Sequence, residues 1–379
     1  MNMHASGVTV RADRVEIVTD TARLAEIGPA WDELWSRTDG LVFQSHAWIS
    51  AWWRTLPDRD RQRRQLRVGL VWNGDRLDAV MPLSIHKRRG LRFLEWAANS
   101  YSDYEDIIAV RDCPPATLQR LWAELTAMGG FDIALLNRLC PGARTRELQS
   151  TGTRPALTPN HRSEISHRVS GDWSTGQAWF DSQSKKTRQN YRRKQATLAE
   201  SGKTQFRLVG PDEPLRPILE RLSALKRQWL DTRGRTSTLF EEGEVALSAL
   251  VEALARAGLL RLFVLEVDGL IVSISVNFEQ RGTLMAFVTS YDPAFERGSP
   301  GTLLMTDYIM WAFDRGLHTV DFLCGAEAFK RRFGTEAVTL GTLTAPGSLR
   351  GRAVLALDRA RHALEQRRPQ KQPDTPAAD

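Results

Sequence analysis

Cysteine is scarce in this sequence: Cys113, Cys140 and Cys324 are the only cysteines among 379 residues. They are odd in number and far apart, which argues against a disulfide framework or a cysteine-rich metal cluster. No apolar run approaches the roughly 18 residues of a transmembrane helix, so we expect no membrane span. The N-terminus, MNMHASGVTVRADRVEIVTD, lacks the apolar core of a secretory signal. These absences favour a protein of the reducing cytoplasm.

Several common catalytic patterns are also missing. The seven histidines occur singly, without the paired spacing of a zinc site, so we expect no metal. Neither a G-x-S-x-G turn nor a convincing Cys–His arrangement is present. Chemistry that depends on a metal or on a covalent nucleophile therefore has little support.

What the chain does have is a globular composition and a local excess of positive charge. It is 42% hydrophobic and 26% charged, with a net charge of +7, and its length suits two or three domains. The basic residues concentrate in SKKTRQNYRRK, residues 184–194, which we interpret as a helix with Arg188 and Arg192 on one face. This helix is either a solvated surface or a phosphate site, for example for a nucleotide-linked or RNA-borne substrate. Tyr191 would stack or hydrogen-bond there.

An internal repeat organises the rest of the chain. LRVGLVWNGDRLDAVMPLSIHKRRG and LRLFVLEVDGLIVSISVNFEQRG each predict a β-hairpin, with turns at Asn73-Gly74 and Asp268-Gly269. A strand, a Ser-Tyr pair, a loop, a helix and a further strand follow each hairpin in the same order. The sequence therefore predicts two copies of one α/β domain.

The two copies differ where the helix begins. In the second copy, ERGSPGT places Ser299 to cap the helix and Gly301 where a ligand can approach its backbone. Free N–H groups at a helix start bind phosphate, and Arg297 adds positive charge. The first copy has Pro114 and Pro115 instead, which lack N–H donors. An anion is therefore expected at the second loop, although Ser-Pro-Gly also begins many purely structural helices.

Acidic residues near the predicted strands have two interpretations each. Asp103, in NSYSDYEDI, lies either in a solvated turn or beside an acceptor site between the copies. Asp321 would either orient an attacking amine or accept its proton, or it would cap local backbone. Trp48, Trp52 and Trp53 occur at helical spacing and are interpreted as core and domain-interface packing.

The second copy resembles the GCN5-related N-acetyltransferase (GNAT) superfamily, and the whole chain resembles its tandem FemAB-like and CelD-like N-acyltransferases. The resemblance spans about residues 14–345. It rests on a Tyr-Asp pair, a Ser-Pro-Gly loop, an Asp-Phe strand, and a Gly, acid and aromatic-Lys series. Here these are Tyr291-Asp292, Ser299-Pro300-Gly301, Asp321-Phe322, and Gly325, Glu327 and Phe329-Lys330.

The resemblance implies roles for these positions. The loop, with Arg297, Gly298, Ser299, Gly301 and Thr302, would bind the pyrophosphate of acyl-CoA. The expected catalytic residues are Asp321, Lys330, Glu327 and Asp103, and the expected substrate-binding residues are Arg188, Tyr191, Arg192 and Tyr291. The sequence departs from the family at Pro300, which removes one loop amide, and at Phe329, where members often carry Tyr.

We therefore predict an α/β fold of two tandem GNAT-like domains with mixed sheets and flanking helices. The expected boundaries are 1–13 for a flexible N-terminus, 14–160 for a degenerate GNAT-like domain, 161–345 for the acyl-CoA-binding domain, and 346–379 for a helix and disordered tail. The expected activity is acyl transfer from acyl-CoA to an amine of an amino sugar, a polysaccharide intermediate or a small metabolite. One alternative is a Fem-type transferase that uses aminoacyl-tRNA, and another is a non-catalytic nucleic-acid-binding or scaffold protein. Nucleic acid is not expected as a partner outside those alternatives, and the sequence does not specify the oligomeric state.

Overall fold

The computed structural model describes residues 14–149, 152, 154–240, 245–325 and 327–367. The segment 1–13, predicted to be flexible, lies outside the described residues, as does 368–379 of the predicted tail. The side chain of Phe329 is also outside them.

One mixed sheet runs through the described part of the chain. Its order is β1-β2-β3-β4-β6-β13-β7-β12-β11-β10-β9-β8, and β5 pairs only with β3. The strands are β1 Arg14–Val18, β2 Arg64–Asn73, β3 Arg76–Arg88, β4 Leu91–Trp96, β5 Ile108–Ala109, β6 Ile133–Leu139, β7 Thr158–Ser170, β8 Thr204–Leu208, β9 Leu260–Val267, β10 Leu270–Gln280, β11 Thr283–Tyr291, β12 Thr319–Cys324 and β13 Glu336–Pro346.

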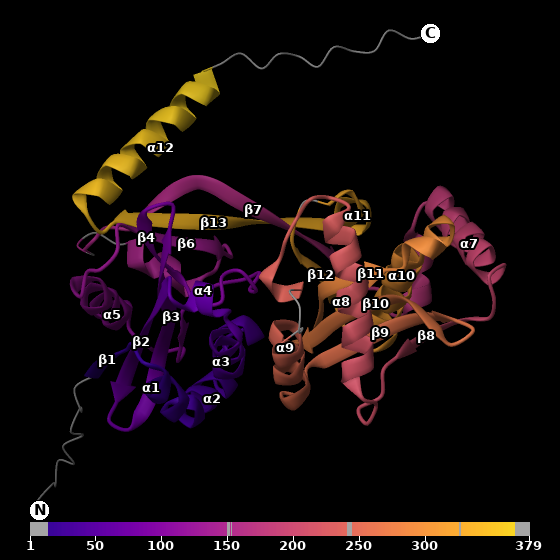
Figure 1. Ribbon diagram of the computed structural model, residues 1–379, viewed down its shortest axis with the longest axis horizontal. Helices are drawn as coiled ribbons and strands as arrows, with labels where there is room; N and C mark the ends of the chain where they lie inside the picture. Colours follow the sequence, from indigo (N-terminus) through magenta and orange to yellow (C-terminus); the bar gives the residue numbers. More distant parts are fainter. Residues whose placement is uncertain (1–13, 150–151, 153, 241–244, 326, 368–379) are drawn as a thin grey trace, which may run out of the picture.

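The sheet order confirms the predicted tandem α/β fold. In the first half, strands β1 to β4 form an antiparallel meander, and β6 follows a helix to lie parallel to β4. In the second half, β8 to β11 form the same meander, and β12 follows a helix to lie parallel to β11. We call β1–β6 the first half and β8–β12 the second half; Figure 1 shows them as two lobes.

Strands β7 and β13, at the centre of the sheet, connect the halves because each pairs with a strand of the other half. Strand β7 leaves the first half and pairs with β12, whereas β13 leaves the second half and pairs with β6. The two strands also pair with each other along most of their length, which joins the lobes in Figure 1. The predicted boundary between residues 160 and 161 falls inside β7.

The helices cover both faces of this sheet. Helices α2 and α5 pack on the first half, α8 and α10 pack on the second, and α3 packs against α9 across the junction. They are α1 Thr21–Glu26, α2 Gly28–Ser36, α3 His46–Thr55, α4 Asp58–Arg61, α5 Pro115–Ala127, α6 Gly176–Ser182, α7 Lys185–Ala199, α8 Leu215–Asp231, α9 Val245–Arg256, α10 Pro300–Asp314, α11 Ala328–Phe333 and α12 Leu349–Arg367.

The tryptophans of α3 lie in a core shared by both halves, which confirms their predicted packing role. Trp48 and Trp52 are fully buried. The Trp48 ring meets the Phe287 ring of β11 edge-on at 5.4 Å, and Phe43 meets Phe278 of β10 at 5.5 Å. Burial of such large rings contributes strongly to stability. It therefore fixes β11 against the first half.

The hairpin turns were predicted correctly in one copy and displaced by one residue in the other. Asp268 and Gly269 form the β9–β10 turn, both with positive φ. In the first hairpin Asn73 still pairs with Arg76, so the turn is Gly74-Asp75. Gly74 has φ of 63°, so glycine takes the left-handed position and Asn73 stays in the strand.

Candidate active site

A cavity of about 510 Å³ lies between the halves, where β11 and β12 diverge. The two strands pair only at residues 283–285 of β11 and 319–321 of β12. Beyond that point residues 286–291 of β11 line the cavity, as does Phe322 of β12. The edge of β11 that faces β12 therefore loses its strand partner where the cavity begins.

The unpaired edge of β11 offers backbone hydrogen-bonding groups to the cavity. Asp292 donates its N–H to Val272 of β10, so alternation along the strand turns the polar backbone groups of Thr289 and Tyr291 away from β10. The Lys226 ammonium donates to the Thr289 carbonyl at 3.3 Å, as this direction requires. A β-bulge at Phe287 interrupts the β10–β11 register in the same segment.

The start of α10 closes one end of the cavity. Ser299, Gly301, Thr302 and Tyr291 all line it, as predicted for residues near a ligand. A Cβ atom on Gly301 would lie 3.1 Å from Cδ1 of Tyr291, so glycine permits close packing here. In this first turn Pro300 has no N–H, and the N–H groups of Thr302 and Leu303 donate to the Ser299 carbonyl. The Gly301 N–H donates to no acceptor among the described backbone groups and is the one that suits an anion.

Two members of the predicted loop face elsewhere. Arg297 is exposed and does not line the cavity, and its carbonyl accepts a hydrogen bond from Lys194 at 2.7 Å. Gly298 is buried, and a Cβ there would lie 3.0 Å from Leu198 of α7. Its small size therefore serves the packing of α7. Ser299 has a left-handed backbone (φ 49°), so its side chain does not make the predicted cap bond.

Asp103, half-buried, lines the cavity from the first half. Burial raises the pKa of its carboxyl to about 6, against the opposing charges of Arg138 and Lys330. A carboxylate with such a pKa accepts a proton more readily than an ordinary aspartate near neutral pH.

Glu327 and Lys330 of the second half line the same cavity. Lys330 is only 8% exposed, and its ammonium lies 3.2 Å from the Glu327 carboxylate. It also donates a hydrogen bond to the Cys324 carbonyl at the end of β12. The cavity thus brings Asp103, Glu327 and Lys330 together from both halves.

Asp321 is placed differently from the other predicted catalytic residues. It is 1% exposed and does not line the cavity. Its carboxylate accepts hydrogen bonds from Tyr104 (2.8 Å), Ser166 (2.9 Å), Arg168 (2.8 Å) and the N–H of Leu323 (2.8 Å). These donors come from the first half, β7 and its own strand. The interpretation as a cap of local backbone fits this geometry, and the contacts also join the two halves.

The basic helix α7 lies outside the main cavity. Arg188 donates to the Asp181 carbonyl, and Arg192 is exposed. The Tyr191 hydroxyl donates to Asp307 of α10. Tyr191 and Lys194 line a smaller recess that shares Thr302 with the main cavity. The predicted substrate-binding residues of α7 are thus near the start of α10 but separate from the acids.

Sequence reasoning missed two cavity residues, Lys226 and Tyr308. Burial lowers the pKa of Lys226, whose ammonium lies 4.6 Å from the Trp229 ring centre. The sequence carried a sign of this position: Lys226 lies four residues from both Leu222 and Leu230, so it falls on the apolar side of α8. Tyr308 of α10 also lines the cavity, and no described residue hydrogen-bonds its hydroxyl. Burial raises the pKa of this phenol, so it stays protonated.

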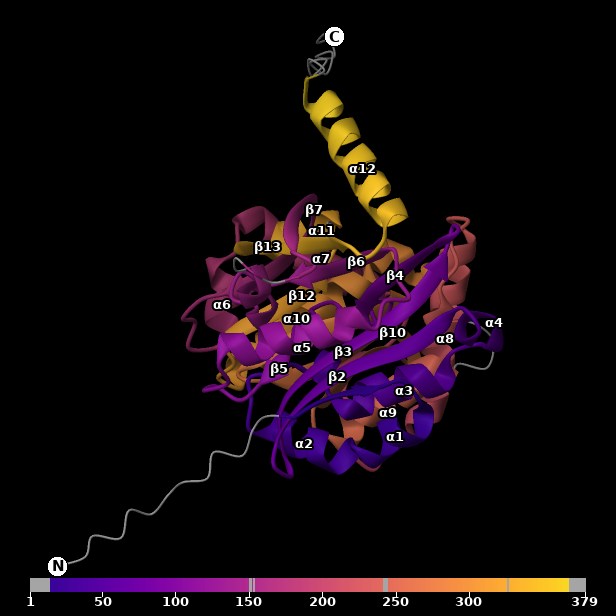
Figure 2. The ribbon, with the colours of Figure 1, turned by 90° about the vertical axis from the view of Figure 1, so that its left-hand side faces the viewer.

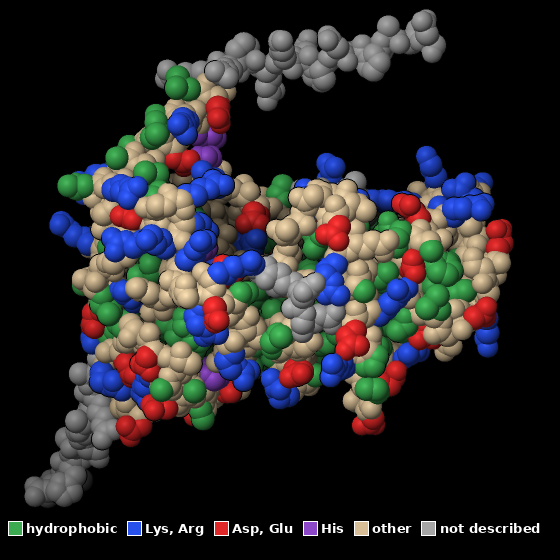
Figure 3. All heavy atoms as spheres, in the orientation of Figure 1, with side chains coloured by type: hydrophobic (Ala, Val, Ile, Leu, Met, Phe, Trp, Pro, Cys, Tyr) green, Lys and Arg blue, Asp and Glu red, His purple; other side chains and the backbone are tan. Residues whose placement is uncertain are grey.

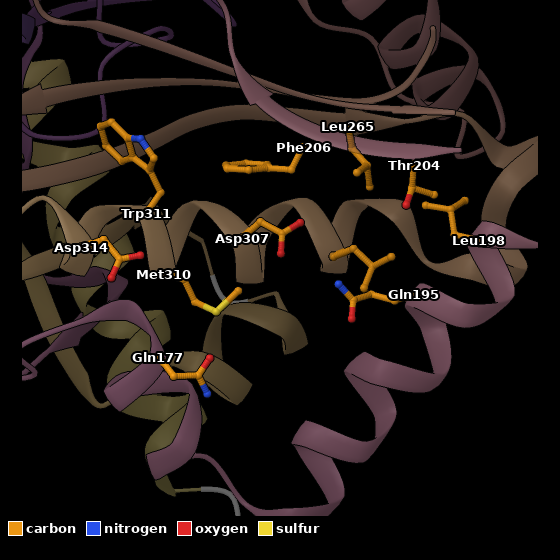
Figure 4. Close-up of a pocket in the computed structure, with 11 residues that line it drawn as sticks. Gln177, Gln195, Leu198, Thr204, Phe206, Leu265, Asp307, Met310, Trp311 and Asp314 are labelled. Carbon is orange, nitrogen blue, oxygen red and sulfur yellow. The ribbon is translucent and has the colours of Figure 1, made fainter. Parts of the chain in front are cut away.

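A second cavity, of about 440 Å³, lies on the outer side of α10 (Figure 4). It is enclosed by α6, α7, α10 and the strands β8 and β9, and burial raises the pKa of its Asp307 to about 6. None of the predicted site residues lines it. The main cavity is therefore the candidate active site.

The described residues contain no group of three or more His, Cys, Asp or Glu side chains that could hold a metal ion. Among these residues there is also no helix with the length and apolar character needed to cross a membrane.

Comparisons with known proteins agree with this architecture. Similar solved structures include FemX, with a TM-score of 0.57 and 10% identity over 90% of this chain and 100% of that one. The C-terminal domain of a candidate lysylphosphatidylglycerol synthetase from Agrobacterium fabrum has a TM-score of 0.55 and 13% identity over 89% and 96%. L-PGS from Bacillus licheniformis has a TM-score of 0.52 and 12% identity over 90% and 96%. At these identities the likeness concerns the fold.

The family match concerns the half that contains the diverging strands. No curated protein matches the chain. Residues 185–331 match the family model described as an acetyltransferase (GNAT) domain, and this range includes β11, β12 and the start of α10. Residues 185–331 therefore contain a GNAT domain, and this domain supports an acyltransferase activity.

Proposed function

We propose that the protein transfers an acyl group from an acyl-CoA thioester to an amine in the cavity between its halves. The observation that carries this proposal is the divergence of β11 and β12 beside the start of α10. The N–H of Thr289 and the backbone groups of Tyr291 suit the amides of a pantetheine arm, while the Thr289 carbonyl accepts from Lys226. The Gly301 N–H and the positive end of the α10 dipole suit a pyrophosphate.

In this proposal the amine approaches the thioester from the first half, and Asp103 accepts its proton. The carbonyl carbon gains a C–N bond and loses its C–S bond, without a covalent enzyme intermediate. Backbone N–H groups near the bulge at Phe287 would stabilise the oxyanion. The departing thiolate takes up a proton, and Tyr308 is our candidate donor because its phenol faces the cavity and stays protonated.

The acceptor belongs to one of the predicted classes: an amino sugar, a polysaccharide intermediate or a small amine metabolite. The half-buried ring of Trp229 and the charged groups of Arg138, Glu327 and Lys330 line the acceptor side of the cavity. Such a lining suits a polar molecule with a flat apolar face. The protein would act in the cytoplasm, where acyl-CoA is available.

The exposed basic face of α7 favours a second candidate, transfer from aminoacyl-tRNA. Lys185, Lys186, Arg192 and Arg193 are exposed, and Figure 3 shows basic side chains gathered over this end of the molecule. The recess beside α7 shares Thr302 with the main cavity, so a polyanion on α7 would lie close to the candidate active site.

Titration of both donors at near-physiological salt distinguishes the two candidates. We expect acetyl-CoA to bind with a dissociation constant on the order of micromolar, as is usual for enzyme substrates. Transfer RNA should bind weakly, with an affinity that falls by about one power of salt concentration per phosphate contacted. Tight binding specific to charged tRNA, without a response to acyl-CoA, would establish the second candidate. Binding of neither would favour the scaffold alternative.

A further inference from the structure

Helix α12 rises away from the body of the molecule and contacts it along one face only (Figures 1 and 2). Gly351 and Leu355 are buried at its base. Asp358 forms an ion pair with Arg162 of β7 at 2.8 Å, and the ring of His362 stacks on that of His161 at 3.9 Å. These contacts fix which face of α12 turns outward.

The outward face of α12 is an exposed apolar stripe. Leu349, Leu357 and Leu364 are 80%, 52% and 61% exposed, which is unusual for leucine. Exposed alanines fill the positions between them, at intervals of three or four residues that keep one helical face: Ala353, Ala356, Ala360 and Ala363. This stripe is visible along the outer edge of α12 in Figure 3.

Arginines border the stripe on both edges. Arg352 and Arg359 lie on one edge, and Arg350 and Arg361 lie on the other, as their helical positions require. All four are exposed. The acidic residues Asp358 and Glu365 fall on the opposite side of the helix.

The positive charge continues onto the body below α12. Lys87, Arg89 and Arg92 are exposed at the turn between β3 and β4. A Cβ on Gly90 in that turn would lie 3.5 Å from the Arg350 guanidinium, so the turn adjoins the base of the helix. An apolar stripe and a basic patch therefore form one surface.

We propose that this surface docks on an anionic lipid membrane, with α12 lying in the headgroup region. Leucines would enter the acyl boundary, while the flanking arginines reach the lipid phosphates. The charge pattern argues against a second copy of this chain as the occupant. Two such helices packed stripe to stripe would bring their arginine rows together. An in-plane helix of this kind requires no membrane span.

Sedimentation with phosphatidylcholine vesicles, with and without phosphatidylglycerol, tests the proposal on the full chain. We expect binding only to the anionic vesicles, and weaker binding at high salt because the charges are screened. The double variant Leu357→Asp, Leu364→Asp should bind about tenfold more weakly or worse, since it removes two inserting side chains. Leu270→Asp, at a leucine that is 50% exposed on the β9–β10 turn, is the matched control and should bind normally.

A charge variant and a size measurement complete the test. Arg352→Gln with Arg359→Gln should weaken binding more than Arg192→Gln with Arg193→Gln, which removes the same charge from α7. Unchanged melting temperatures would show that the variants fold. The proposal is overturned if the parent ignores anionic vesicles, or if the leucine variant binds as the parent does. Light scattering that finds a dimer dispersed by Leu357→Asp would also overturn it, because the stripe would then be a self-association surface.

Discussion

At the scale of single residues, two acids that look alike in the sequence have different positions relative to the cavity. Asp103 and Asp321 were both predicted to be catalytic. Asp103 lines the cavity and has a raised pKa. The Asp321 carboxylate instead accepts hydrogen bonds from groups in the first half, β7 and β12. No local pattern distinguishes them, because their partners lie far away along the chain. The same is true of Lys226, whose cation lies in the cavity only because α8 packs beside β11.

Replacing Asp103 by Asn should reduce turnover by about a hundredfold or more, the usual contribution of a positioned base. The pH profile gives a second readout. A base works in its deprotonated form, so a pKa of about 6 means that parent activity is full above pH 7 and falls as the pH drops through 6. The variant should lose this acidic limb.

The exposed Asp172, which does not line the cavity, provides the control for that change. Asp172→Asn should leave both turnover and the pH profile unchanged. If Asp103→Asn retains parental turnover, the proton acceptor lies elsewhere, with Glu327 next to be tested.

At the scale of elements, sequence patterns predicted the local structure well. The basic run became α7, the second hairpin turned at Asp268-Gly269, and a helix begins after Ser299. Periodicity and turn chemistry are local, so they can be read from one segment. The purpose of Gly298 could not be read in this way, because only the approach of Leu198 from α7 defines it. The exchange of β7 and β13 also depends on pairing between distant strands.

The start of α10 can be tested by adding a side chain at Gly301. Gly301→Val places atoms beside Tyr291 and next to the Gly301 N–H, so coenzyme A should no longer raise the melting temperature. Gly142→Val is the matched control, because a Cβ there meets nothing within 4 Å and φ is not positive. Its response to coenzyme A should equal that of the parent. If coenzyme A raised the melting temperature of the parent and both variants equally, the anion would not bind at this loop.

At the scale of the whole molecule, buried polar contacts join the halves around Asp321. Asp321→Asn leaves the Arg168 guanidinium without its counter-ion, so the free energy of unfolding should fall by about 3 kcal/mol. Urea unfolding measures the change. Glu220→Gln breaks an exposed pair with Arg216 and should change stability by about 0.5 kcal/mol or less. A loss at Asp321 as small as that at Glu220 would show that this junction is not a stabilising contact.

The central claim is that acyl-CoA lies between β11 and β12 with its phosphates at the start of α10. Hydrogen–deuterium exchange with and without acetyl-CoA tests this directly, because it reports each protected backbone amide. We predict protection in residues 286–291 and at the Gly301 amide of α10, and none at the start of α5, where Pro114 and Pro115 lack donors. Protection confined to the cavity on the outer side of α10, or to the first half, would contradict the account.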